Sequence, residues 1–190
     1  GDHSIAAGTV GGVTDAGRSG LLWIDAHGDF NTPETSPSGN LHGMPLAALT
    51  GAGVPEMVNL GHPGAKVAAQ NVMLLGIRDL DPEERVALRA SGAGVYTMRE
   101  IDDRGIGPVA REALGRLGLP LVGLSVTSPH KQVAHAVAGA DSPLANRLQA
   151  VNTLVLRRGD RQGESTDAEG VVRAIVARGI EPRGRRTAVV

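Results

Sequence analysis

Short apolar runs alternate with polar, helix-like segments through the first two thirds of the chain. The pattern predicts buried strands at residues 20–25, 71–76 and 119–126, and a shorter strand at residues 94–97. Helices are expected between them, at residues 44–49, 82–90 and 108–117. Strands that alternate with helices in this way are typical of a three-layer α/β fold, in which helices flank a mainly parallel sheet.

The alternation is less regular in the last third of the chain. Helices are predicted at residues 130–138 and 168–178. Between them, residues 151–157 and 162–165 have strand-like patterns, and the turn residues Gly159-Asp160 separate the two. This part of the chain is therefore expected to contain a β-hairpin.

Composition excludes several classes of protein. The chain has no cysteine, which excludes disulfides and thiolate metal sites, and its 19 basic and 20 acidic residues give no charge excess to attract a polyanion. No apolar run approaches the roughly 18 residues of a membrane span, and no signal-peptide pattern is present. We therefore expect a cytoplasmic protein with neither a nucleic acid nor a membrane as its partner.

The first strong strand ends in three side chains that can bind metal. Asp25, His27 and Asp29 follow the apolar run Leu21–Ile24, and in an extended segment alternate side chains point the same way. Together with His3 they suit divalent ions, with Asp25 bridging two of them. The alternative is a strand end whose aspartates accept hydrogen bonds from local amides. The mutual repulsion of close carboxylates, which a cation removes, favours the metal site.

Several motifs resemble the arginase family of binuclear manganese ureohydrolases. The resemblance covers residues 1–118. Its motifs are Gly1-Asp2-His3-Ser4, Asp25-Ala26-His27-Gly28-Asp29, Ser38-Gly39-Asn40-Leu41-His42-Gly43, Gly76-Ile77-Arg78-Asp79-Leu80-Asp81-Pro82 and Arg104-Gly105-Ile106-Gly107. It implies that His3, Asp25, His27 and Asp29 bind two Mn²⁺ ions and that L-arginine is hydrolysed to ornithine and urea.

The same resemblance implies how the substrate is held. Asn31, Ser36 and Ser38 would bind the α-carboxylate of L-arginine, and Asp81 its α-amino group. His42 would be the proton shuttle, a role that suits an imidazole near a metal-bound nucleophile. The alternative for His42 is a loop histidine that hydrogen-bonds a carbonyl group.

One metal motif of the family has no counterpart. Arginases carry a second Asp-x-Asp at the end of the strand that matches residues 119–126, whereas this chain continues Leu124-Ser125-Val126-Thr127-Ser128-Pro129. The glutamate that recognises the guanidinium group also has no counterpart. Since Mn²⁺ prefers about six oxygen or nitrogen donors, we expect at most one weakly held ion and an impaired or inactive hydrolase.

Residues 119–190 carry a second set of motifs, which resembles shikimate dehydrogenases. The motifs are Ser125-Val126-Thr127-Ser128-Pro129-His130-Lys131, Ala150-Val151-Asn152-Thr153 and Ser165-Thr166-Asp167-Ala168-Glu169-Gly170. The resemblance implies a catalytic pair, Lys131 and Asp167, with Thr127 and Asn152 binding shikimate. The glycine-rich loop for the cofactor NADP is expected only beyond Val190. The alternatives are a solvated lysine at a helix start and an aspartate that caps a helix.

Two resemblances in one chain predict a chimera of two incomplete parts. Residues 1–118 would be an arginase-like metal-binding segment, and residues 119–190 a piece of a shikimate dehydrogenase substrate domain. Three functions stay open: a manganese hydrolase of arginine, a remnant of an NADP-dependent oxidoreductase, and a catalytically silent α/β protein. Members of both families often form oligomers, so self-association is open as well.

Overall fold

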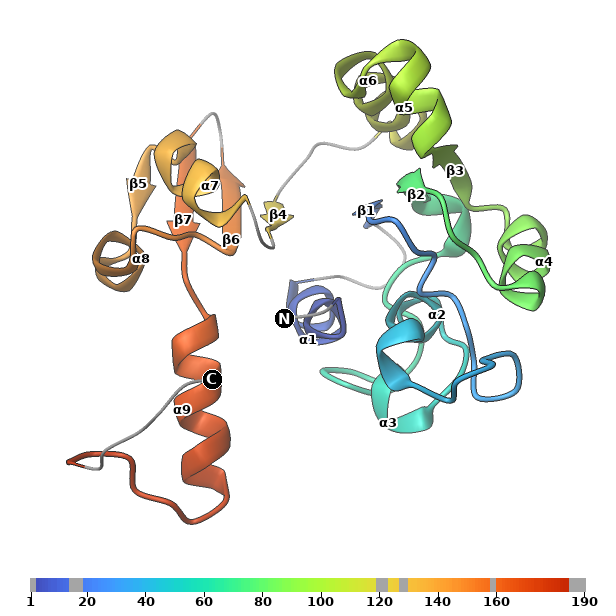
Figure 1. Cartoon of the computed structure of the whole chain (residues 1–190). Helices are drawn as coiled ribbons and strands as arrows, with labels where there is room; N and C mark the ends of the chain where they lie inside the picture. The colour runs from blue at the N-terminus through green and yellow to red at the C-terminus, as the bar shows by residue number, and fades with distance from the viewer. Residues whose placement is uncertain (1–2, 14–18, 119–122, 127–129, 158–159, 185–190) are drawn as a thin grey trace. The chain divides into compact units, whose positions relative to one another are not determined.

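The computed structural model describes residues 3–13, 19–118, 123–126, 130–157 and 160–184. The chain divides into two compact units, Gly1–Pro120 and Leu121–Val190 (Figure 1). Each unit has its own sheet and its own apolar core. The two units are described separately below.

The first unit is built on a three-stranded parallel sheet. Its strands are β1 (Leu21–Ile24), β2 (Val72–Ile77) and β3 (Gly94–Thr97), in the spatial order β1-β2-β3. The central strand β2 pairs in parallel with both neighbours, and Trp23 on β1 lies opposite Leu74 on β2. The parallel sheet expected from the sequence is therefore confirmed in this unit.

Helices cover the sheet of the first unit. They are α1 (Ile5–Val13), α2 (Pro45–Leu49), α3 (Pro55–Val58), α4 (Pro82–Ser91), α5 (Met98–Arg104) and α6 (Ile106–Leu117), with 3₁₀ turns η1 (Leu41–Gly43) and η2 (Ala69–Asn71). One apolar cluster joins Leu74 to α2 and α4, and the other joins Leu75 to α6. Because neighbouring strand residues point to opposite faces, these clusters form two cores, one on each side of β2. This arrangement is the expected three-layer one.

The second unit contains a mixed sheet. Its strands are β4 (Gly123–Ser125), β5 (Ala140–Asp141), β6 (Thr153–Arg157) and β7 (Asp160–Glu164), in the order β4-β6-β7-β5. The pairs β4–β6 and β6–β7 are antiparallel, and only β5–β7 is parallel. The expectation of a mainly parallel sheet is wrong here, because an apolar run predicts a strand without fixing its partner. The predicted hairpin is confirmed as β6–β7.

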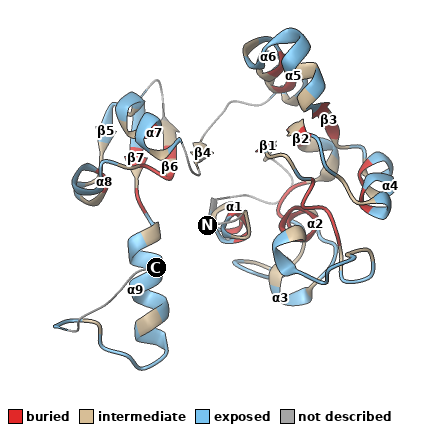
Figure 2. Ribbon diagram, in the orientation of Figure 1, coloured by how far each residue is buried: buried red, intermediate tan, exposed pale blue. Residues whose placement is uncertain are grey.

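The core of the second unit is small. Its helices are α7 (Lys131–Val137), α8 (Pro143–Leu148) and α9 (Asp167–Ala177). Ala134, Ala145, Val151 and Leu154 form its buried cluster. Figure 2 shows α9 almost wholly in the colours of exposed and half-buried residues, in contrast to the buried α2. Among the described residues, no helix combines the length and the apolar character that crossing a bilayer requires.

The buried centre of β2 makes the first unit sensitive to cavities. We predict that Leu74→Ala, at a fully buried position, lowers the free energy of unfolding by roughly 2–5 kcal/mol, because it removes contacts on a strand that pairs on both edges. Urea denaturation followed by far-ultraviolet circular dichroism measures the change. Val86→Ala on the exposed face of α4 is the control and should shift stability by less than about 0.5 kcal/mol. Equal losses in both variants would contradict the proposed core.

Candidate metal centre and adjoining pocket

The chain bends where β1 ends, and backbone hydrogen bonds to β2 hold the bend. The amide of Asp25 donates to the Leu75 carbonyl at 3.1 Å. The Ala26 carbonyl then accepts from the amides of Arg78 and Asp79 at 2.9 and 3.1 Å. The segment after β1 therefore lies beside the segment after β2, at the carboxyl ends of two parallel strands. Ligand sites of open α/β sheets form at this edge.

The segment does not stay extended as far as Asp29. Asp29 has a φ of +50°, in the left-handed region that L-residues other than glycine seldom occupy. Its carbonyl accepts hydrogen bonds from the amides of Leu46 and Ala47, in the first turn of α2, at 2.9 and 3.3 Å. The premise of a simple alternation from Asp25 to Asp29 is therefore wrong. A turn of the backbone, and not an extended strand, brings the side chain of Asp29 to that of Asp25.

Three of the four expected metal ligands form one cluster. Ligand atoms of His3, Asp25 and Asp29 all lie within 4.8 Å of one another. The Nδ1 atom of His3 is 2.6 Å from Asp25 Oδ2 and 3.6 Å from Asp29 Oδ2. One imidazole and two carboxylates are donors that fit a single divalent cation such as Mn²⁺.

His27 lies outside this cluster. Its side chain is 63% exposed, and its Nδ1 is 3.1 Å from Oδ1 of Asp25, the carboxylate oxygen that does not face His3. The amide of His27 also donates to Asp25 Oδ1 at 2.9 Å. The local amide bond of the alternative interpretation is therefore present beside the ligand cluster. Among the described residues, a second ion would have only Asp25 and His27 as donors from this group.

Electrostatics at the cluster favour a positive charge beside the two carboxylates. Partial burial lowers the pKa of His3, but hydrogen bonds and charge attraction from Asp25 and Asp29 outweigh it and raise that pKa to about 9. Burial raises the pKa of Asp25, but the bonds to His3 and His27 outweigh it and lower the pKa to about 2. At neutral pH a protonated His3 therefore balances the carboxylates when no metal is bound.

Trp23 supports His3 from the sheet side. The two rings lie with their centroids 4.2 Å apart at an interplanar angle of 49°. Trp23 is buried on β1, two residues before Asp25. The chain has one tryptophan. The indole therefore forms one wall of the space in which His3 meets the aspartates.

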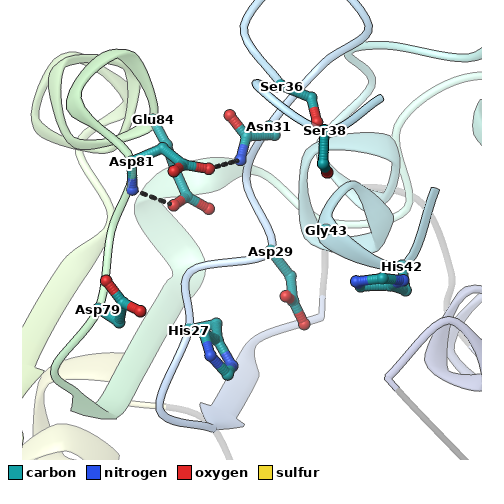
Figure 3. Close-up of a pocket in the computed structure, with 10 residues that line it drawn as sticks. All are labelled: His27, Asp29, Asn31, Ser36, Ser38, His42, Gly43, Asp79, Asp81 and Glu84. Carbon is teal, nitrogen blue, oxygen red and sulfur yellow. Dashed lines mark hydrogen bonds between the residues drawn. The ribbon is translucent and has the colours of Figure 1, made fainter. Parts of the chain in front are cut away.

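A pocket of about 190 Å³ adjoins the cluster. The residues that line it are His27, Asp29, Asn31, Ser36, Ser38, His42, Gly43, Asp79, Asp81 and Glu84. Figure 3 shows these side chains around one space, with Asp29 and His27 at one end and Asn31, Asp81 and Glu84 at the other. The pocket thus contains every residue for which the sequence predicts a role in binding arginine.

The predicted substrate ligands are tied into local hydrogen bonds. Asn31 donates from Nδ2 to Asp81 Oδ2 at 2.8 Å. Ser36 accepts from the Gly39 amide at 3.0 Å, and Ser38 from the Asn40 amide at 3.2 Å. His42 belongs to η1 and is exposed at the pocket.

Glu84 is a pocket residue that the sequence analysis missed. It is 4% exposed, accepts a hydrogen bond from the Phe30 amide at 2.8 Å and another from the Asp81 amide at 3.2 Å. Burial raises its pKa, as do the charges of Asp81 and Asp29, against the opposing effect of the two amides. The signal was present: Asp81 and Glu84 have the spacing of a capping box, which α4 forms. Asp79, also missed as a site residue, pairs with His27 through the backbone in an isolated parallel β-bridge.

In the second unit, three predicted site residues meet. Lys131 Nζ lies 2.5 Å from Asp167 Oδ2, and Asn152 Nδ2 donates to Asp167 Oδ1 at 2.8 Å. Asn152 is buried and also accepts from the Thr166 amide at 3.1 Å. Burial raises the pKa of Asp167, but the bonds to Lys131 and Asn152 outweigh it and lower the pKa. Thr127, the remaining member of the predicted set, lies outside the described residues.

Comparisons with known proteins match the first two thirds of the chain. The arginase family matches residues 1–128. The arginase of Bacillus caldovelox is 48% identical over 118 residues, which are 62% of this chain and 40% of that protein. The structure of Bacillus subtilis arginase is 50% identical with a TM-score of 0.58, over 62% of this chain and 42% of the other.

A second similar structure contains a ligand. It is Entamoeba histolytica arginase in complex with L-ornithine, which is 35% identical with a TM-score of 0.55, over 62% of this chain and 41% of the other. These matches support neither the shikimate dehydrogenase resemblance of residues 119–190 nor a chimera.

The His3 cluster predicts how the stability of the metal-free protein depends on pH. The pKa of His3 is raised to about 9 in the folded protein, against 6.5 for an ordinary histidine. The protonated side chain therefore contributes its full stabilisation below pH 6.5, and this contribution is lost as the pH rises through 9. Because the pKa of Asp25 is lowered, its ionised carboxylate stabilises the fold above about pH 3.8, and this contribution is lost as the pH falls towards 2. In EDTA, we expect the free energy of unfolding to be up to ~3 kcal/mol greater at pH 6 than at pH 9.5.

Urea denaturation of wild type and His3→Asn at both pH values measures this contribution. The substitution should remove most of the difference, whereas His130→Asn, at an exposed position of the second unit, should leave it unchanged. An identical pH dependence in wild type and His3→Asn would show that His3 does not meet the aspartates.

Proposed function

The chain belongs to the arginase family, and from that membership we propose that its first unit carries a manganese-dependent hydrolase site for the guanidinium group of L-arginine, with ornithine and urea as products. The chain spans about 40% of the length of the curated relatives it matches. The activity of those whole proteins is therefore a proposal for this chain, and it rests on the residues that the chain contains. Its main support is the ligand cluster of His3, Asp25 and Asp29 beside the pocket.

The cluster would hold one Mn²⁺ ion. His3, Asp25 and Asp29 offer an imidazole nitrogen and two carboxylate oxygens, and the proton on His3 would leave as the ion binds. When bound, manganese supplies an ionised water as a nucleophile at neutral pH. His42, exposed at the pocket, would pass a proton between solvent and the reacting group.

The charges that line the pocket suit arginine at both ends. Asp29 and Asp79 would attract the guanidinium cation near the metal cluster. Asp81 would face the α-ammonium group. For the α-carboxylate, Asn31, Ser36 and Ser38 offer neutral amide and hydroxyl groups, which donate hydrogen bonds without adding charge.

We propose that catalysis here is weak. No Asp-x-Asp follows β4, where the sequence continues Val126-Thr127-Ser128. Within the part of the chain that the structure describes, a second ion would have two donors from this group, Asp25 and His27, which is well below the roughly six that Mn²⁺ prefers. The site would then hold at most one ion.

Manganese binding and urea release test the proposal together. We expect saturating Mn²⁺ to raise the melting temperature of the wild type, because the ion binds the folded state alone. Slow, manganese-dependent release of urea from L-arginine should accompany it. Asp25→Asn, which removes a ligand charge, should weaken manganese binding about tenfold or more and abolish the urea signal.

Asp102→Asn, an exposed change on α5, is the matched control and should leave both signals unchanged. Absence of a manganese-induced shift in the wild type would refute the metal site. A shift without urea release would leave a metal-binding protein that does not hydrolyse arginine.

The second unit favours a separate candidate function. We propose that Lys131, Asn152 and Asp167 bind a hydroxylated carboxylic acid of the shikimate type. The support is their mutual contact, since a buried Asn152 and a charged pair from two helices offer both donors and acceptors to a substrate hydroxyl. The sequence contains no G-x-G-x-x-G fingerprint for NADP. The proposal concerns ligand binding by these three residues.

Titration calorimetry with shikimate tests this second site. We expect shikimate to give a measurable heat of binding with the wild type. Its affinity should be about tenfold lower, or lower still, in Lys131→Ala, because Asp167 and a substrate hydroxyl lose the donor that they share. Arg147→Ala, which removes an exposed cation from α8, is the control and should bind as the wild type does. Equal heats in wild type and Lys131→Ala would show that the pair has a structural role only.

A further inference from the structure

We propose that Glu84 is a positioning residue: it clamps the peptide group after Asp29, and so holds this metal ligand in its left-handed conformation and at a fixed separation from Asp81. The inference deepens the proposed function and rests on it for the role of the metal. It stands on the backbone contacts of one buried carboxylate in the first unit.

The peptide group between Asp29 and Phe30 is held from both sides. Its carbonyl accepts hydrogen bonds from the amides of Leu46 and Ala47 at 2.9 and 3.3 Å. Its N–H donates to Glu84 Oε1 at 2.8 Å. Because carbonyl and N–H belong to one planar unit, the two contacts together fix how that plane is oriented. The orientation sets ψ at Asp29, and with it the direction of the carboxylate relative to His3 and Asp25.

A clamp is needed because Asp29 is not glycine. Its φ of +50° is sterically unfavourable for an L-residue, and such a conformation persists only where the surroundings impose it. The α2 amides hold one side of the peptide, but they leave the N–H of a buried segment without a partner. Glu84 supplies the acceptor for that N–H. A buried donor without an acceptor would favour a different turn.

The backbone beside Asp29 is shaped to admit this carboxylate. A Cβ atom on Gly28 would lie 2.7 Å from Glu84 Oε1 and 2.6 Å from Leu80 Cδ2. Both distances are shorter than van der Waals contact, so a larger residue at position 28 would displace the Glu84 carboxylate or the Leu80 side chain. Gly28 lies between the predicted ligands His27 and Asp29. The absence of a side chain at Gly28 therefore lets the Glu84 carboxylate lie against the backbone of the segment that carries His27 and Asp29.

The second oxygen of Glu84 connects the clamp to the other end of the pocket. Oε2 accepts from the Asp81 amide at 3.2 Å, at the start of α4. Asn31, two residues after Asp29, donates to the Asp81 carboxylate at 2.8 Å. Figure 3 shows Glu84 and Asp81 side by side, with both Asp81 bonds drawn. Two connections thus fix the separation between the metal cluster and the group proposed to receive the α-ammonium of the substrate.

Three variants and two measurements test the role of Glu84. Glu84→Gln keeps the shape and one acceptor, and Glu84→Ala removes both. Glu83→Gln makes the same charge change at an exposed position of the same helix and is the matched control. The first measurement is hydrogen exchange at the Phe30 amide in the metal-free protein, relative to the amide of Leu74 in the core. The second is Mn²⁺ affinity from the electron paramagnetic resonance signal of the free ion.

We expect the Phe30 amide to exchange about tenfold faster in Glu84→Gln and faster still in Glu84→Ala, with Leu74 unchanged. The Kd for Mn²⁺ should rise about tenfold in Glu84→Gln and stay constant in Glu83→Gln. Unchanged Phe30 exchange would overturn the proposal, and so would equal acceleration at Phe30 and Leu74, since that reports a global loss of stability. Should the wild type bind no Mn²⁺, the proposed function fails, while the exchange measurement still decides the role of Glu84. If Glu84→Ala does not fold, Glu84→Gln carries the test.

Discussion

The candidate metal centre of the first unit depends on the meeting of two carboxylates, the half-buried Asp25 and the buried Asp29. Two like charges about 4 Å apart repel by roughly 4 kcal/mol at the effective dielectric of such a site, so a positive group must stand between them. His3 supplies that charge as a protonated imidazole when no metal is present. The same three side chains are the donors that a divalent cation would use. A proton and a metal ion would thus compete for one place between the two carboxylates.

Backbone hydrogen bonds, more than side-chain packing, set the geometry of this centre. The bend after β1 is held by the Ala26 carbonyl, and the turn at Asp29 by α2 on one side and Glu84 on the other. The two partners of the Asp29 turn belong to elements that are buried or capped: every residue of α2 is buried, and α4 begins with a capping box. Hydrogen bonds to α2 and α4 therefore hold the turn at Asp29, next to Phe30, which packs in the core of the first unit.

The sequence indicated much of this site, for identifiable reasons. An apolar run followed at once by Asp25 predicts a strand that presents an acid at its carboxyl end, and the parallel sheet of the first unit has that arrangement. The pattern could not reveal the left-handed conformation of Asp29, because Asp adopts positive φ more often than most residues but still in only a minority of cases. Residues 5–13 were not predicted as a helix, since glycines lower helix propensity. One of these, Gly11, has the Leu60 carbonyl 2.8 Å from where a Cβ would lie, so tertiary contact overrides propensity there. The antiparallel pairing of β4 with β6 could not be predicted either, because an apolar run does not specify which strand it pairs with or in which direction.

The contact between His3 and Trp23 has an optical consequence. The chain has a single indole, and its ring centre is 4.2 Å from that of the imidazole. An excited indole transfers an electron readily to a neighbouring imidazolium, and this transfer quenches the indole fluorescence. Transfer to a neutral imidazole is much less efficient. Alkali that removes the proton from His3 would therefore raise the fluorescence of Trp23. Trp23 is therefore an intrinsic fluorescent probe of the protonation state of His3, and no added dye is required.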